Sequence, residues 1–253
     1  MQTVLITGAS SGIGYEFAHI FAQNNYNLVL VARNKEKLEE IQKTYPNITV
    51  QVIIKDLREN IAPKSLFEAL QKTPIDIIVN NAGFWDYGYF HEIDIEKELS
   101  MIDLNVRSLT ELTYLFWKEM VKRKNGKILN VASTAAFFPG PLMSVYYATK
   151  HYVLAFSEGI AEEWASYGVT VTTLCPGPTE SWFQNSAQMG TSKLFKWKKL
   201  PTSQEVAEFG YTSLMKGKRV AIHGFLNNIL VSSTRMIPSP ISSKIVKKVQ
   251  EKA

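Results

Sequence analysis

Two tyrosines and a lysine lie within one short stretch, SVYYATK, of residues 144–150. Side chains three and four positions apart share a face of an α-helix, so Lys150 could reach either Tyr146 or Tyr147. A nearby ammonium favours the ionised form of a phenol and lowers its pKa from ~10, which suits a proton donor or acceptor at neutral pH. The helical spacing alone leaves both tyrosines open as the reactive one.

A second set of candidate residues lies in the turn TGASSGIG, residues 7–14, between an apolar run and a segment with apolar residues at helical spacing. Glycine lets the backbone turn sharply and approach a pyrophosphate, and the following helix offers free N–H groups to it. Any tight strand-to-helix turn can use glycine, but this context favours a dinucleotide site. The residues assigned to it are Gly8, Ser10, Ser11, Gly12, Ile13 and Gly14.

The residue type after the second predicted strand bears on the choice of cofactor. At this distance from the glycine turn an acidic residue would bind the ribose of NAD, but the strand is followed by Arg33. A guanidinium can pair with the 2′-phosphate of NADP, so the sequence favours NADP(H), with Ser10 and Asn34 as further donors to that phosphate. The alternative is that Arg33 is a solvated arginine at the start of a helix.

Polar and small residues also follow the third and fourth predicted strands. Asp56 is expected either to accept a hydrogen bond from the adenine amino group or to cap a turn. We assign the stretch VNNAG to the cofactor site, where Asn80 is expected to hold neighbouring strands together. Ala82 and Gly83 are expected to leave room for the cofactor ribose.

The chain between these residues alternates short apolar runs with helical patterns. This alternation predicts an α/β fold: one doubly wound parallel sheet of the Rossmann type, with about seven strands and helices on both faces. Ligands of such sheets bind beyond the carboxyl ends of the strands, where the strand order reverses. We expect one domain over residues 1–253, with strands in residues 3–7, 26–32, 48–55, 75–80, 126–133, 169–177 and 218–224.

The motifs taken together resemble those of the classical short-chain dehydrogenase/reductase family. The resemblance covers nearly the whole chain and rests on TGASSGIG, NNAG, Asn105 in DLNV, Ser133, YYATK and CPGPTES. The family's pattern of a tyrosine followed four residues later by a lysine selects Tyr146, with Lys150, over Tyr147. It implies that Tyr146 is the general acid of carbonyl reduction, or the base of the reverse reaction, and that Ser133 hydrogen-bonds the substrate oxygen. The Lys150 ammonium, together with the oxidised nicotinamide of the product complex, would favour the phenolate and lower the pKa of Tyr146.

The same resemblance implies further contacts. Lys150 would also anchor the nicotinamide ribose, and Asn105 would hold a water in a proton relay behind it. Pro176, Gly177 and Thr179 would cover the nicotinamide, with the threonine bonding its carboxamide. Oligomers are usual in the family, so a homodimer or homotetramer formed through the two long helices is expected.

The substrate is less well defined by the sequence. A variable lid is expected at about residues 181–200, and its many apolar side chains suit a bulky apolar carbonyl compound, although aromatic residues also pack lids shut. Phe84, Trp85, Phe137 and Phe138 are expected at the same opening. Three functions stay open: an NADPH-dependent reductase of ketones or aldehydes, a reductase of 3-oxoacyl groups on an acyl carrier protein, and a non-catalytic NADP-binding regulatory protein.

The charge is unevenly distributed along the chain. Residues 1–192 carry 16 Lys and Arg against 20 Asp and Glu, a net charge of −4, whereas residues 193–253 carry 12 against 3, a net charge of +9. A basic amphipathic helix around Ile245, Val246 and Val249 could lie on an anionic membrane, and a basic lid could attract an acidic carrier protein. The favoured alternative is a solvated charge run whose apolar stripe packs on the core.

Composition sets the remaining expectations. The single cysteine, Cys175, allows no internal disulfide and lies in an apolar run, where a buried, inert thiol is expected. The sequence shows neither a secretory signal pattern nor an apolar run of ~18 residues, which favours a cytoplasmic protein. We assign no metal site and no nucleic-acid partner.

Overall fold

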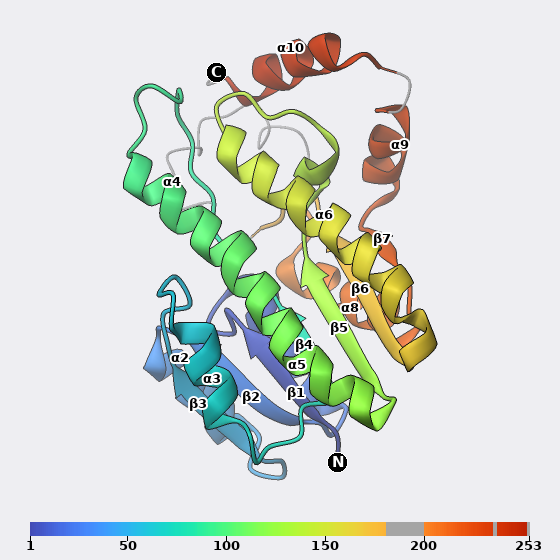
Figure 1. The fold of residues 1–253 in the computed structure, drawn as a ribbon. Helices are drawn as coiled ribbons and strands as arrows, with labels where there is room; N and C mark the ends of the chain where they lie inside the picture. Colours follow the sequence, from blue (N-terminus) through green and yellow to red (C-terminus); the bar gives the residue numbers. More distant parts are fainter. Residues whose placement is uncertain (181–199, 235–236, 252–253) are drawn as a thin grey trace.

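The computed structural model describes residues 1–180, 200–234 and 237–251. Its centre is a seven-stranded sheet in the order β3-β2-β1-β4-β5-β6-β7, in which every neighbouring pair is parallel (Figure 1). The predicted doubly wound, Rossmann-type fold is confirmed, and each expected strand range contains the observed strand. The strands are β1 (Thr3–Thr7), β2 (Asn27–Ala32), β3 (Val50–Ile54), β4 (Ile77–Asn80), β5 (Gly126–Val131), β6 (Val169–Cys175) and β7 (Val220–Ile222).

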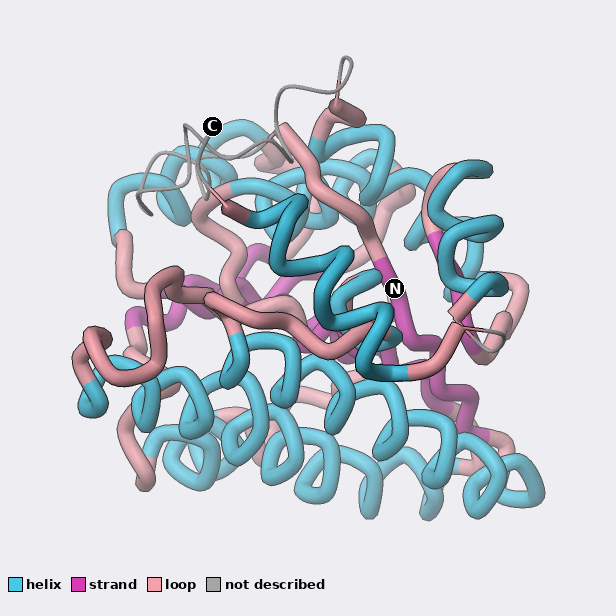
Figure 2. Tube along the Cα trace, turned by 90° about the horizontal axis from the view of Figure 1, so that it is seen from above, coloured by secondary structure: helices cyan, strands magenta, loops and turns pink. Residues whose placement is uncertain are grey.

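Helices cover both faces of this sheet, and Figure 2 shows the strands between two layers of helices. One face packs on α1 (Gly12–Gln23), α2 (Lys35–Thr44) and α8 (Ser203–Met215). The other packs on α3 (Ala62–Ala69), α5 (Leu109–Arg123) and α6 (Ser144–Trp164). Because both faces are covered, strands such as β1 are buried at every residue, which explains why they read as continuous apolar runs.

Two connections on the α5–α6 side are irregular. The helix α4 (Ile95–Ile102) continues through a π-helical turn, Asp103–Ser108, directly into α5. After β5 a short 3₁₀ helix, Thr134–Phe137, begins at Ser133, whose side chain accepts a hydrogen bond from the Ala135 N–H at 3.1 Å. Both irregular turns contain a residue for which the sequence indicates a catalytic role, and π-helical turns often mark functional sites.

The last two helices, α9 (Phe225–Ser233) and α10 (Ser239–Gln250), follow β7. In Figure 1, α10 lies above the carboxyl ends of the strands. Its last residue holds it there, because the Gln250 carbonyl accepts a hydrogen bond from the Tyr87 hydroxyl at 3.0 Å and the Gln250 amide donates to the Tyr147 hydroxyl at 2.6 Å. Among the described residues no helix is both long enough and apolar enough to cross a membrane.

Candidate active site

A cavity of about 950 Å³ lies where the strand order reverses between β1 and β4, at the upper end of the range typical of ligand pockets, ~300–1,000 Å³. Its wall brings together residues from turns that are far apart in the sequence. Most of the predicted site residues line it: Gly8, Ser10, Ser11, Gly12, Ile13, Arg33, Asp56, Ala82, Gly83, Ser133, Tyr146, Lys150, Pro176, Gly177 and Thr179. Gly14, Asn34, Asn80 and Asn105 are not part of the wall.

The glycine turn needs its glycines for two different reasons. Gly8 and Gly12 have φ angles of +67° and +55°, in the left-handed region that other residues rarely adopt. Gly14 lies behind the cavity, where an added Cβ would stand 2.4 Å from the Gly8 carbonyl oxygen. Gly14 therefore acts by allowing α1 to approach the turn closely, while the other two shape the surface that a pyrophosphate would contact.

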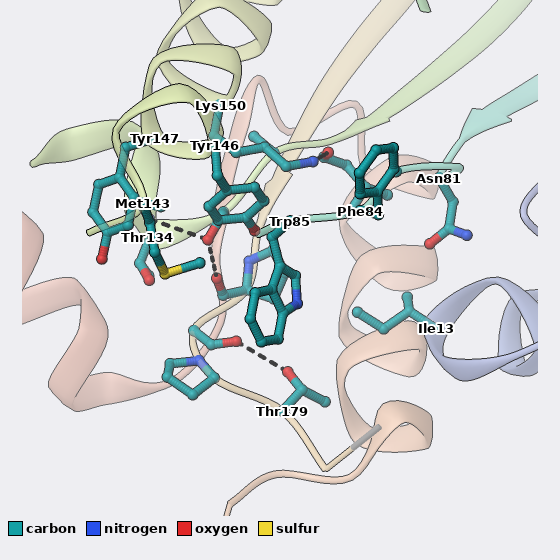
Figure 3. Close-up of a pocket in the computed structure, with 18 of the residues that line it drawn as sticks. Ile13, Asn81, Phe84, Trp85, Thr134, Met143, Tyr146, Tyr147, Lys150 and Thr179 are labelled. Atoms are coloured by element: carbon teal, nitrogen blue, oxygen red, sulfur yellow. Dashed lines mark hydrogen bonds between the residues drawn. The ribbon is translucent and has the colours of Figure 1, made fainter. Parts of the chain in front are cut away.

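The second asparagine of VNNAG is the one that reaches the cavity. The Asn81 side chain donates to the Thr7 carbonyl at 3.0 Å, and Asn81 lines the wall (Figure 3). Asn80 is buried instead and donates to Thr113 at 3.0 Å and to Asn130 at 2.9 Å. The prediction that Asn80 ties strands together is confirmed, because Asn130 belongs to β5, but burial separates it from the cofactor cavity to which the sequence assigned it.

The expected adenosine end carries two arginines and a carboxylate. Arg33 is largely exposed and lies 4.0 Å from Asp56, while the Arg58 guanidinium pairs with the same carboxylate. Hydrogen bonds from Arg58 hold the pKa of Asp56 below its usual value, so the carboxylate stays ionised. Asp56 also accepts from the Arg58 N–H at 3.1 Å, so it caps a turn while lining the cavity.

Asn34 lies outside the cavity wall and has another role. Its side chain accepts a hydrogen bond from the Lys37 N–H at 3.0 Å and caps α2. This side chain satisfies one of the unpaired N–H groups of the helix, which is the usual role of asparagine at this position. The cap uses the side-chain oxygen of Asn34 and not its amide N–H groups, so the predicted contact of Asn34 with a phosphate remains a prediction. Sequence reasoning missed Arg58, which does line the cavity.

Ser133, Tyr146 and Lys150 converge at the other end of the cavity. The side chains of Tyr146 and Lys150 both come from α6 and point into the cavity, opposite the loop that carries Phe84 (Figure 3). Tyr146 and Ser133 share a side-chain hydrogen bond. The Lys150 amine is buried, donates to the Val131 carbonyl at 2.8 Å and lies 5.8 Å from the centre of the Tyr146 ring.

Burial is the main influence on the pKa values of Tyr146 and Lys150 within the protein itself. Burial raises the pKa of the Tyr146 phenol, and the hydrogen bond with Ser133 only opposes this effect. Burial likewise lowers the pKa of Lys150 to about 8, so both groups are biased toward their neutral forms. The lowered phenol pKa that Lys150 and the oxidised nicotinamide would produce together remains a prediction, since burial is the main influence on both side chains in the protein itself.

Tyr147 has a contact that helical spacing did not predict. Tyr147 lies about 100° around the helix from Tyr146, and this position predicts packing with His151 and Leu154, yet its ring lines the cavity beside Met143 (Figure 3). Its hydroxyl accepts from Gln250 of α10, and burial raises the pKa of this phenol. Tyr147 thus joins the cavity wall to α10, whereas Tyr146 is the tyrosine paired with Ser133.

Asn105 supports the catalytic residues from behind. It is buried in the π-helical turn, where its amide group donates to the Phe84 carbonyl at 2.9 Å and to the Thr149 hydroxyl at 3.2 Å. Its carbonyl oxygen would lie 2.9 Å from a Cβ on Gly83, and the Lys150 amine 3.7 Å from the same point. Asn105 therefore lies close behind Lys150 and fixes the loop after β4 against α6, while the predicted water relay remains a prediction.

The expected aromatic opening is partly present. Phe84, Trp85 and Phe138 line the cavity, but Phe137 packs in a separate cluster with Leu109 and Val153 because it belongs to the 3₁₀ helix that turns away. The expected lid at residues 181–200 lies outside the described residues except for its last position. Sequence reasoning also missed a wall from α9, α10 and their connection: Leu230, Ser233, Thr234, Ile237, Ser242, Ile245, Val246, Val249 and Gln250.

Two further expectations concern buried thiols and metals. Cys175 is buried, and burial raises the pKa of its thiol to about 12, as expected for an inert cysteine. Among residues 1–180, 200–234 and 237–251, no group of His, Cys, Asp and Glu side chains is arranged to hold a metal ion.

Comparison with known proteins decides the family. Residues 2–191 match the model of the short chain dehydrogenase family. The chain belongs to this family. Its members are NAD(P)(H)-dependent oxidoreductases, and this agrees with the glycine turn and the Ser133, Tyr146 and Lys150 cluster in one cavity.

Individual relatives are about one third identical to this chain over the segments that match. A human 17-beta-hydroxysteroid dehydrogenase type 3 is 36% identical over 180 residues, covering 69% of this chain and 58% of the relative. A very-long-chain 3-oxoacyl-CoA reductase of Anas platyrhynchos is 35% identical, covering 68% and 58%. The match thus spans little more than half the length of these relatives. A short-chain dehydrogenase from Sphingobium yanoikuyae in complex with NADPH superposes with a TM-score of 0.83 at 29% identity, covering 93% of this chain and 94% of that one.

Proposed function

We propose that this protein is an NADPH-dependent reductase that converts a ketone or aldehyde on a bulky apolar molecule to an alcohol, reversibly. The observation that carries the proposal is one cavity that joins a glycine turn and Arg33 at one end to Ser133, Tyr146 and Lys150 at the other. The residues along the cavity also suit a dinucleotide. Gly8 and Gly12 shape its pyrophosphate end, and Gly83 leaves open a position that a Cβ would fill 2.9 Å from Asn105.

The chain's own residues account for the proton side of the reaction. NADPH, when bound, supplies the hydride that is added to the carbonyl carbon. The Tyr146 phenol gives its proton to the carbonyl oxygen, and the Ser133 hydroxyl hydrogen-bonds that oxygen while its negative charge develops. Lys150, whose amine donates to the Val131 carbonyl, would hydrogen-bond the cofactor ribose and would supply positive charge near the phenolate that is left.

The preference for NADPH over NADH rests on the adenosine end. Arg33, Lys55 and Arg58 all line the cavity there, and no carboxylate other than Asp56 is found among the described residues of this wall. Asp56 is already paired with Arg58, which leaves Arg33 as the more exposed guanidinium for a 2′-phosphate. The relative in complex with NADPH supports this assignment.

The proposed substrate class follows from the apolar wall at the catalytic end. Trp85, Phe138, Leu230 and Val246 surround the space beyond Tyr146, and few charged groups are available to a polar substrate. Relatives named for hydroxysteroids and for very-long-chain 3-oxoacyl-CoA agree with a large apolar substrate. The second candidate is therefore the reduction of a 3-oxoacyl thioester, on coenzyme A or on an acyl carrier protein.

The decisive experiment is NADPH oxidation against a carbonyl panel. The panel contains a 17-ketosteroid, a long-chain 3-oxoacyl-CoA, a 3-oxoacyl group on an acyl carrier protein and an aromatic ketone, with Tyr146→Phe as the control enzyme. Turnover of apolar ketones by the parent chain and not by the control supports the proposal, and turnover of thioesters alone supports the second candidate. Tight NADPH binding without turnover of any member would favour the non-catalytic regulatory role.

A further inference from the structure

Exposed apolar side chains gather on the last two helices. On α9 they form two adjacent pairs that are four residues apart, and on α10 they recur every fourth residue. Each set therefore forms one face of its helix. Phe225 at the start of α9 is 79% exposed. The α9–α10 surface consists of Phe225, Leu226, Ile229, Leu230, Ile241, Ile245 and Val249.

On α10, the exposed apolar residues are different from the residues that pack the helix against the rest of the protein. Ser242 and Gln250 are buried, and Val246 lies between them on the same inward side, at intervals of four residues. The exposed stripe of Ile241, Ile245 and Val249 is displaced by one residue, or about 100° around the helix. The sequence favoured an apolar stripe packed on the core, but the structure packs only the inward stripe and leaves this second one at the surface.

The charges beside the stripe have one sign. α10 carries Lys244, Lys247 and Lys248, and neither α9 nor α10 contains an aspartate or glutamate. Lys247 lies on the side of α10 opposite the stripe, with its amine 5.9 Å from the centre of the Tyr89 ring. Lys244 and Lys248 lie on the side of the apolar stripe away from the cavity, as the helical spacing requires. Apolar side chains flanked by lysines complement an anionic lipid bilayer. The apolar side chains insert into its interior, and the lysines are attracted to its headgroups.

The surface is also continuous with the cavity. Leu230, Ile245 and Val249 are about half exposed and at the same time line the cavity wall. A bilayer in contact with the outer side of these residues would therefore lie next to the opening through which a substrate enters. An apolar substrate that enters from the bilayer by this path avoids the unfavourable transfer into water.

We propose that the α9–α10 surface docks on the surface of an anionic lipid bilayer and places the cavity opening against it. The docking itself stands on exposure and charge, whereas the entry of substrate from the bilayer rests on the proposed function. The lysines strengthen binding at low ionic strength, because salt screens their attraction to headgroups. The apolar stripe supplies the part of the binding that salt does not weaken.

The test is co-sedimentation of the full chain with vesicles, which requires no turnover. We expect binding to phosphatidylcholine–phosphatidylserine vesicles at low salt, and at least tenfold weaker binding to pure phosphatidylcholine vesicles or at high salt. K244Q/K247Q/K248Q and, separately, I241S/I245S/V249S should each lose at least tenfold in affinity. The matched control K35Q/K37Q/K43Q removes three exposed lysines from α2 and should bind as the parent chain does.

The variants must keep their fold and their NADPH binding for the comparison to count, and circular dichroism with NADPH titration checks both. Tyr146→Phe should bind vesicles normally, so failure of the proposed activity is distinguished from failure of docking. Absence of vesicle binding at low salt, or equal losses in the α2 control, would overturn the proposal. The proposal would also be overturned if light scattering showed that the chain is a dimer and that only I241S/I245S/V249S dissociates it. Binding of an acyl carrier protein through the lysines, without binding to vesicles, would overturn it as well.

Discussion

The glycine turn after β1 and the helices after β7 contribute to the same cavity in different ways. Gly8 and Gly14 act through backbone geometry, with contacts so close that only glycine fits. Val246 and Gln250 act through side chains on a helix that hydrogen bonds with Tyr87 and Tyr147 hold against the cavity. The first region leaves a recognisable spacing in the sequence, whereas the second depends on contacts between residues more than 100 positions apart.

The difference has a consequence for function. A backbone turn that fits a phosphate allows little variation, so it suits a cofactor that is the same in every cycle. A helix wall tied by a few hydrogen bonds can change its side chains without disturbing the sheet, so it suits the substrate end. Changes in the first region should therefore affect cofactor binding or stability, and changes in the second should affect the substrate KM.

Among changes at the cofactor end and at the substrate end of the cavity, the largest effect is expected for Arg33→Asp. A charge-assisted pair with a 2′-phosphate is worth ~1.5–3 kcal/mol, so NADPH should bind roughly tenfold to a hundredfold more weakly. NADH should bind equally well or better, because a carboxylate can accept from its ribose hydroxyls. Titration with both cofactors measures the ratio of affinities, and an unchanged ratio would mean that Arg33 is only a solvated residue.

A stability effect of comparable size is expected for Gly14→Ala. Its Cβ would meet the Gly8 carbonyl oxygen at 2.4 Å, so the turn must shift, at a cost of ~1–3 kcal/mol in the free energy of unfolding. The control is Gly159→Ala in α6, where a Cβ meets nothing within 4 Å and should add up to ~1 kcal/mol of helix propensity. Denaturant unfolding compares the two. Equal effects at both positions would contradict the close approach seen at the turn.

The smallest effect is expected in the second region, for Gln250→Leu. Losing the hydrogen bond to Tyr147 costs ~0.5–1.5 kcal/mol and should loosen α10. The KM for a bulky apolar ketone should rise a few-fold, while the kcat for a small soluble ketone and the affinity for NADPH stay the same. Hydrogen exchange in α10 provides a direct readout, with Gln204→Leu on the exposed side of α8 as the control. A loss of NADPH affinity would show that α10 also supports the cofactor end.

These two regions also show how much of the fold and of the site could be predicted from the sequence. The strands and most of the cofactor and catalytic residues could be predicted, because each strand is a continuous apolar run and each motif directly follows one. The choice between Asn80 and Asn81 could not, since neighbouring residues at a strand end point to opposite sides. Capping a helix and binding a phosphate call for the same residue type at the same place, so the sequence could not decide between these roles for Asn34, which caps α2.

The catalytic electrostatics could be predicted only in part. The pattern of residues selects Tyr146 and Lys150, but the pKa of each depends on how deeply the fold buries them. The α9–α10 wall was missed for a related reason: the sequence shows that α10 is amphipathic but not which of its two stripes faces inward. Burial of this kind is a property of the tertiary packing.

The measurement that tests the central claim most directly compares Tyr146→Phe with Tyr147→Phe in steady-state carbonyl reduction. The account predicts that Tyr146→Phe lowers kcat by at least the ~10²–10⁴ expected for the loss of a general acid, with NADPH affinity and melting temperature unchanged. Tyr147→Phe keeps the ring, loses only its hydrogen bond with Gln250, and should change the KM a few-fold with kcat preserved. A Tyr147→Phe enzyme without turnover, beside an active Tyr146→Phe enzyme, would contradict the assignment.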